Sequence, residues 1–168
     1  MIDDPAARGR AIAAFHASTA PRLFEQIVEA DAVPIATRAQ AWREWEVFTL
    51  YACVRGLVSA GGFNRETAAA IDAMHEAVLE GWMAAPATEE TFDARRARIA
   101  ERYAEYGGIG QAGGASGATT VADRLGAAAS RHMSAPAEPL PGLDEMASAL
   151  HEALADGAAE AVRHGAAS

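Results

Sequence analysis

Lysine is absent from this chain of 168 residues, and all 14 of its basic residues are arginine. Aspartate and glutamate together number 23, so the formal net charge is −9. Proteins that bind the nucleic-acid backbone or dock on anionic membranes need a cationic surface, because the charges that they approach are negative. We therefore expect neither nucleic acid nor a membrane among the partners. An acidic surface suits a basic protein partner.

Cysteine is also scarce, since Cys53 is the only one in the sequence, and an intramolecular disulfide is excluded. A lone thiol in an apolar segment fits a reducing compartment. The first residues, from Met1 to Pro5, lack the charged-then-apolar order of a signal peptide. No uncharged apolar run approaches the ~20 residues that span a bilayer. These absences predict a cytoplasmic protein.

Alternation of apolar and polar residues is missing over any useful length, so no segment is predicted to be a strand. Apolar residues recur instead at spacings of three and four, which is typical of helices. Hydrophobic residues make up 51% of the chain, and a helical domain of this length buries a sizeable core without disulfides or metals. We expect one all-α domain over residues 1–168.

The segment from about 37 to 60 is apolar on more than one face. A surface helix needs only one apolar stripe, so this helix is expected to be surrounded by others. Gly61 and Gly62 are its stop signal, and Asn64 is expected to cap the next helix. We predict a bundle of five to seven helices, mostly antiparallel, around this central helix.

The ends of the chain are interrupted by proline and glycine. Asp4 and Pro5 are typical of a helix start, and the first thirty residues form either two short helices or one helix bent near Pro21. The glycine-rich stretch 107–118 is predicted to be a flexible loop, and the proline-rich stretch 134–142 a stiff connector. Together these two segments are expected to set off the C-terminal helices.

The last predicted helix, from about 143 to 164, carries a narrow seam of leucine and small residues. Its members are Leu143, Ala147, Leu150, Leu154, Gly157 and Ala161. Such a heptad-like seam packs against a second helix, which belongs either to the same bundle or to a second copy of the chain. With the large aromatic residues of the middle segment, this seam predicts a homodimer.

An arginine-rich segment follows Thr88, which is expected to cap a further helix. Acidic residues lie near the start of that helix, whereas Arg95, Arg96, Arg98 and Arg102 come later, an order that complements the helix dipole. We interpret these arginines mainly as a solvated face, in preference to an anion site.

No motif of strong chemical specificity is present, and we predict no catalytic residue and no cofactor. Residues 108–113 formally match the glycine pattern of dinucleotide-binding proteins, but they follow a predicted helix in a chain without predicted strands. A linker explains them better. The five histidines are scattered, and none has the spacing of a zinc site.

A metal-dependent helical-bundle enzyme is one alternative. Asp72 and His75 lie one helical turn apart, as in the carboxylate–x–x–His pairs of helical di-metal proteins, and Glu44 or Glu46 is a candidate for a further ligand. The pair has no second copy in the sequence. His75 is equally explained as a core-edge histidine that hydrogen-bonds Asp72 or a backbone carbonyl.

A small-ligand site between the two middle helices is another alternative. The residues of this candidate site are Trp45, Tyr51, Arg55, His75 and Trp82. A partly buried arginine among aromatic rings suits an anionic ligand, and clefts between helices commonly bind small molecules. The competing interpretation is a core with one structural ion pair, in which Arg55 binds a carboxylate such as Glu44 or Asp72.

The leading hypothesis from sequence is a non-catalytic interaction or accessory protein that forms a homodimer and binds a protein partner. It rests on the lack of a catalytic constellation, a nucleotide loop or a paired metal motif. The ligand-binding bundle with an anion site near Arg55 is the second hypothesis, and the metal-dependent enzyme is the third.

Overall fold

The computed structural model describes residues 1–84, 90–113 and 118–165. These residues form six α-helices and one 3₁₀ turn, and no strand occurs among them, which confirms the predicted all-α bundle. The elements are α1 (Pro5–Glu29), η1 (Ile35–Thr37), α2 (Arg38–Gly61), α3 (Arg65–Ala84), α4 (Phe92–Gly113), α5 (Ala118–Ser134) and α6 (Leu143–His164). None of the helices in these ranges is both long enough and apolar enough to cross a membrane.

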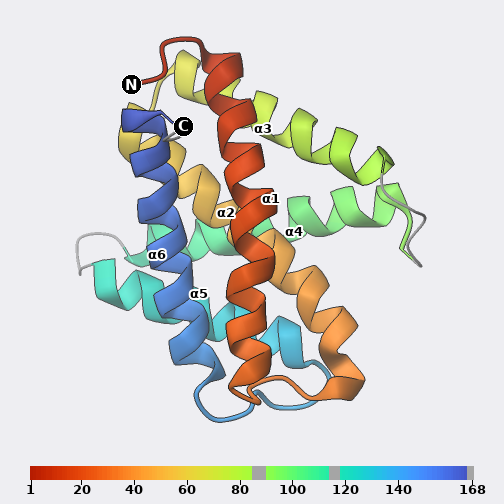
Figure 1. Ribbon diagram of the computed structural model, residues 1–168. Coiled ribbons are helices and arrows are strands. Elements are labelled where there is room, and N and C mark those ends of the chain that lie inside the picture. Colours follow the sequence, from red (N-terminus) through yellow and green to blue (C-terminus); the bar gives the residue numbers. More distant parts are fainter. Residues whose placement is uncertain (85–89, 114–117, 166–168) are drawn as a thin grey trace.

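Helix α2 is the central helix, as the sequence predicts. It contacts every other helix of the bundle, and Figure 1 shows it passing behind α1. Trp45, Phe48 and Leu57, which project from different sides of it, are all fully buried. Its observed bounds differ by one residue from those predicted. A helix that is apolar over several faces therefore ends up enclosed, because any other position would leave large side chains in water.

The signals that begin and end the helices act locally. The Asp4 carboxylate accepts hydrogen bonds from the backbone N–H groups of Ala6 and Ala7 and so caps α1. Gly62 ends α2 with a φ of 75°, a left-handed conformation that glycine adopts without strain. Asn64 accepts a hydrogen bond from the N–H of Thr67 at the start of α3, as predicted.

Of the two alternatives for the first thirty residues, the structure has one helix that contains Pro21.

The predicted glycine-rich loop is wrong for residues 107–113, which continue α4 as helix. Packing supplies the physical reason. Tyr106 is fully buried, Ile109 packs against the same core, and Gly113 is so close to α5 that a Cβ atom there would lie 2.2 Å from Val121 Cγ2. The burial of Tyr106 and Ile109 outweighs the poor helix propensity of glycine, and the close approach at Gly113 has room only for glycine. Residues 114–117 lie outside the described ranges, as does Thr88, the expected cap.

The C-terminal helices share the core of the bundle, and the seam of α6 packs within the chain. Leu143, Ala147 and Leu154 are buried against neighbouring helices. Gly56 of α2 touches α6 so closely that a Cβ atom would lie 2.6 Å from the Ala155 carbonyl oxygen. Of the two partners that the sequence leaves open for the seam, the structure therefore has the chain's own bundle, and the seam no longer supports a homodimer.

Helices α1 and α3 touch at one end and separate toward the other. At Gly9 a Cβ atom would lie 2.4 Å from the Ala70 carbonyl oxygen, so the two backbones meet directly. From this contact α3 leaves at a steep angle (Figure 1). The space between the diverging helices is backed by α2, and a cleft opens there.

Candidate functional site

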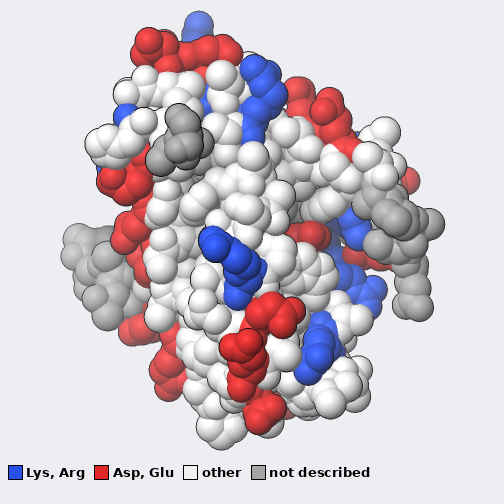
Figure 2. Space-filling view, in the orientation of Figure 1, with Lys and Arg blue, Asp and Glu red and all other residues white. Residues whose placement is uncertain are grey.

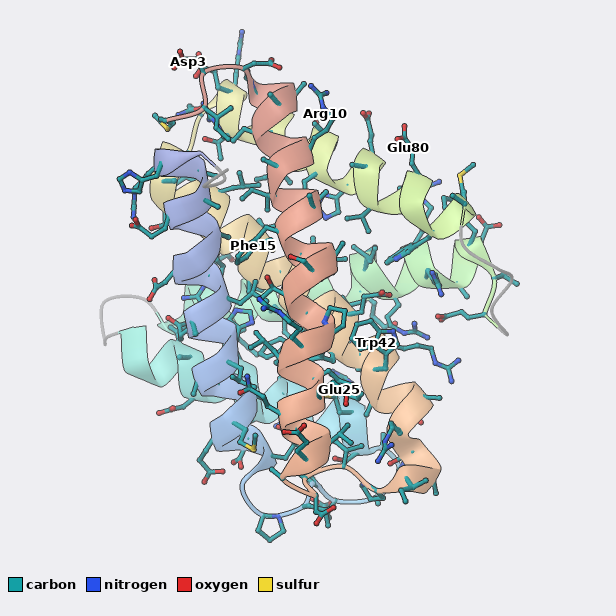
Figure 3. All side chains as sticks on the ribbon, in the orientation of Figure 1. Asp3, Arg10, Phe15, Glu25, Trp42 and Glu80 are labelled. Atoms are coloured by element: carbon teal, nitrogen blue, oxygen red, sulfur yellow. The ribbon has the colours of Figure 1, made fainter. Side chains whose placement is uncertain are left out.

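The cleft between α1, α2 and α3 has a volume of about 550 Å³. Its walls are mainly apolar, and its lining includes Arg10, His16, Trp42, Glu46 and Trp82, with alanines, Pro21, Val78 and Gly81 between them. Figure 2 shows the surface set back between α1 and α3, with acidic and basic atoms behind. Figure 3 places Arg10 and Trp42 on this side of α1, whereas Phe15 lies on the side facing α6.

His16 is a buried, neutral imidazole on the wall of this cleft, with an exposed fraction of 5%. Its Nε2 atom lies 2.9 Å from the Thr49 hydroxyl oxygen, and that hydroxyl donates its hydrogen to the Trp45 carbonyl oxygen at 2.9 Å. We assign the Nε2–H tautomer on this basis, in which the Thr49 oxygen accepts from Nε2–H and Nδ1 is the acceptor nitrogen of the ring. Burial lowers the pKa of His16 to about 4, so the ring stays neutral at pH 7.

Glu46 is the second polar group of the cleft. Its carboxyl is half-buried and lies beside the Trp82 side chain, whose indole N–H favours the charged form of the carboxyl. Burial raises the pKa of Glu46, and the Arg95 guanidinium and the Trp82 side chain offset only part of that rise. The surroundings therefore stabilise the charge of this carboxylate incompletely.

Behind the cleft, α4 supplies arginines that pair with carboxylates. Arg102 binds the buried Glu44 through two hydrogen bonds, Nε to Oε2 at 2.8 Å and Nη2 to Oε1 at 3.1 Å. Arg98 lies 3.4 Å from Glu44 Oε1 and also donates from Nη1 to Glu90 Oε2 at 2.8 Å. The guanidinium of Arg95 lies 4.8 Å from the centre of the Trp82 ring.

The predicted solvated arginine face is wrong for three of its four members. The side chains of Arg95, Arg98 and Arg102 are only 14–21% exposed, whereas Arg96 is exposed as predicted. The buried partners Glu44 and Glu90 come from α2 and from the segment before α4, so their contribution is not visible in the charge pattern of α4 alone.

The structure does not bring the five residues of the predicted ligand site together. Trp45 is fully buried and donates its indole N–H to the Ala20 carbonyl oxygen at 3.0 Å. Tyr51 packs among other aromatic rings, and Arg55 forms an ion pair with Glu152 of α6. The anion site expected near Arg55 is therefore occupied by a carboxylate of the chain itself, one that differs from the two predicted partners.

Of the other predicted site residues, only Trp82 lines the cleft. His75 faces α4 instead, with Nδ1 2.8 Å from the Ile71 carbonyl oxygen and Nε2 2.8 Å from the Tyr103 hydroxyl. The backbone alternative for His75 is thus confirmed. Asp72 is exposed, and no group of three metal-ligating side chains occurs in the described part of the chain, so the metal-site alternative has no geometric support.

Sequence reasoning missed His16 as a cleft residue, although a signal for it exists. Ile12, His16 and Ala20 are spaced by four, so they share one face of α1, and all three are buried. Most buried polar groups are hydrogen-bonded, so a histidine on an apolar face suggests a buried polar partner. The partner, Thr49, comes from another helix, and only the tertiary structure identifies it.

Chemically, the cleft offers hydrogen-bond acceptors between apolar walls. His16 Nδ1 and the Glu46 carboxyl can accept from a ligand, and the described lining contains no hydroxyl or thiol nucleophile. No protein-family model matches this sequence, and neither a curated protein nor a solved structure matches the chain. The functional argument therefore rests on the geometry of the cleft.

Proposed function

We propose that this protein binds a small, largely apolar molecule in the cleft between α1, α2 and α3 without transforming it. The observation that carries this proposal is the buried, neutral His16, which lines the cleft and has a second ring nitrogen besides the one that contacts Thr49. A volume of about 550 Å³ lies within the range of small-molecule sites, about 300–1,000 Å³. Apolar walls with a few convergent polar groups are the usual composition of such sites.

Gly81 provides a test that fills the cleft without disturbing the fold. It lines the cleft, and a Cβ atom there would meet nothing within 4 Å. Gly81→Leu therefore places a large side chain at the wall of the cleft and raises helix propensity. The matched control is Gly108→Leu on α4, which also has open space around it and lies outside the cleft lining.

The probe for this test is phenylbutanol, a neutral molecule with an apolar body and one hydroxyl group. We expect calorimetric titration to show one binding site in the wild type and in Gly108→Leu, and at least tenfold weaker binding in Gly81→Leu. Equal affinity in all three proteins would place the probe outside the cleft and contradict the proposal.

A second candidate function is binding of a protein partner, including a second copy of this chain, as the sequence analysis expects. The observation that favours it is a further hollow of about 550 Å³ that shares Pro21 and Trp42 with the cleft. Ile35 borders this hollow and is 82% exposed. Exposed apolar side chains beside a groove are typical of interaction surfaces.

Light scattering coupled to gel filtration tests the homodimer. An interface at this hollow predicts the mass of two chains at high concentration and of one chain after dilution. It also predicts that the Ile35→Ser dimer dissociates at a higher protein concentration than the wild-type dimer. The mass of a single chain at every concentration would contradict the homodimer.

A further inference from the structure

The polar groups of the cleft define the chemistry of the ligand, if the proposed binding function holds. His16 presents the unprotonated Nδ1, because Thr49 accepts from Nε2–H. Glu46 presents carboxyl oxygens, and the Trp82 side chain beside them favours their charged form. Both groups that converge on the cleft therefore accept hydrogen bonds, and a complementary ligand must supply N–H or O–H donors.

Glu46 also lacks a direct cationic partner within the described residues. The ion pairs behind the cleft belong to two other carboxylates: Arg102 and Arg98 contact Glu44, and Arg98 also contacts Glu90. The Arg95 guanidinium acts on Glu46 at longer range and lies over the Trp82 ring. The raised pKa of Glu46 fits this arrangement, because burial outweighs the nearby positive charges. A cation within the cleft would complete the pairing of this carboxylate.

Two indole rings border the same space. Trp42 comes from α2, one helical turn before Glu46, and Trp82 comes from the last turn of α3. Faces of aromatic rings attract cations, and the attraction is stronger where water is excluded. Trp42 also contributes apolar area and packs edge-on against Phe24 at 5.4 Å between ring centres. Aromatic rings around a carboxylate are a suitable environment for an ammonium group.

From these contacts we propose that the ligand of the cleft is an amphipathic amine, whose protonated amino group binds Glu46 and His16 and whose apolar body lies along the alanine-rich wall of α1. The amino group donates one hydrogen bond to a Glu46 carboxylate oxygen and one to His16 Nδ1. The wall consists of Ala13, Ala14, Ala17 and Ala20, whose small side chains leave room for an alkyl or aryl chain.

An anionic ligand fits the cleft less well. Arg10 is the only cationic side chain in the described lining, and it lies at the rim, 63% exposed and 3.8 Å from the Asp4 carboxylate. A carboxylate placed beside Glu46 would meet a like charge in a partly desolvated site, which is unfavourable. The cleft should therefore bind an amine more tightly than an acid of the same shape, because the two ligands differ only in charge.

Three probes of one shape test this inference: phenylbutylamine, phenylbutanol and phenylbutyrate. At pH 7.5 we expect the wild type to bind the amine at least tenfold more tightly than the alcohol, and the acid most weakly. A hydrogen bond between charged groups stabilises a complex by about 1.5–3 kcal/mol, which corresponds to roughly a tenfold to a hundredfold change in affinity. Calorimetric titration measures all three affinities.

Glu46→Gln removes the charge and keeps an acceptor for Trp82, so the fold should persist; thermal unfolding checks this. We expect this variant to bind amine and alcohol with equal affinity. The control is Glu80→Gln, which removes a carboxylate from the exposed face of α3 that points away from the cleft (Figure 3), and it should keep the preference for the amine.

Each outcome separates the inference from the function on which it rests. A preference for the amine that is lost in Glu46→Gln and kept in Glu80→Gln supports both the binding function of the cleft and the amine as its ligand. Equal binding of amine and alcohol by the wild type, preference for the acid, or amine preference that survives in Glu46→Gln would overturn the amine and leave the cleft as a binding site. Binding of none of the three probes would overturn the proposed function as well.

Discussion

His16 and Thr49 join α1 to α2 through a buried hydrogen bond of 2.9 Å between His16 Nε2 and the Thr49 hydroxyl oxygen. The bond fixes the tautomer of the imidazole, because the Thr49 hydroxyl already donates to a backbone carbonyl of its own helix. A structural contact thus determines which ring nitrogen carries the proton and which one can accept a hydrogen bond. The same burial that keeps the ring neutral makes the stability of the bundle sensitive to acid.

Acid should destabilise the fold through its buried histidines. Burial lowers the pKa of His16 to about 4 and that of His151 to about 3, against about 6.5 for an exposed imidazole. Below pH 6.5 the unfolded chain takes up protons on these rings and the folded chain does not, so stability falls as pH decreases. For one such histidine the loss between pH 6.5 and 4.5 is about 2 kcal/mol.

His151→Phe isolates this effect. The ring of His151 stacks on Phe48 at 4.1 Å, and neither of its nitrogens has a hydrogen-bond partner among the described residues, so phenylalanine should be tolerated. We expect urea unfolding between pH 6.5 and 4.5 to show a shallower loss of stability in the variant. His164→Gln, at an exposed site near the end of α6, is the control and should follow the wild type. Identical pH slopes in His151→Phe and the wild type would refute the prediction.

The pair of Arg102 and Glu44 should contribute measurably to stability. Arg102→Met leaves a carboxylate that is 6% exposed with only the longer Arg98 contact. Since removing one partner of a buried pair is strongly unfavourable, we expect a loss of about 2 kcal/mol in the free energy of unfolding. Arg163→Met, which breaks an exposed pair with Glu160, should change it by less than about 0.5 kcal/mol. Equal losses would show that the Glu44 pair is effectively solvated.

Two glycines in helices should respond oppositely to alanine. Gly56→Ala brings a Cβ atom to 2.6 Å from the Ala155 carbonyl oxygen, so α2 and α6 must separate, at a cost of about 1–3 kcal/mol. Gly108→Ala on α4 meets open space and should stabilise the fold by about 0.5–1 kcal/mol through helix propensity. Thermal unfolding of both variants checks the signs. A stable Gly56→Ala protein would contradict the close packing of α2 against α6.

The helices were predictable where local chemistry determines them. The polar cap at Asp4 and the glycines at the end of α2 act within a few residues, and the broad apolar surface of α2 fixes its central place. The end of α4 was not predictable from composition. Residues 107–113 are rich in glycine, yet Tyr106 and Ile109 anchor them to the core. Such anchoring depends on α2 and α5, which a local pattern does not describe.

The site was less predictable than the fold because its polar groups come from different helices. Trp82 was identified as a candidate and lines the cleft, whereas Arg55 was expected to hold an anion and instead pairs with Glu152. Glu46 was considered only as a metal ligand. Glu46 lines the cleft with Trp82 because α1 and α3 diverge above α2. That divergence starts from the close approach of the two helices at Gly9.

The most direct test of the central claim uses the three tryptophans of the chain as reporters. Two of them, Trp42 and Trp82, line the cleft, and Trp45 is buried with its indole N–H bound to Ala20. In a nitrogen-15 correlation spectrum, assigned with single Trp→Phe variants, titration with phenylbutylamine should shift the indole signals of Trp42 and Trp82 and leave that of Trp45 nearly unchanged. Shifts of Trp45 alone, or of none of the three signals at saturating probe, would contradict a binding site in this cleft.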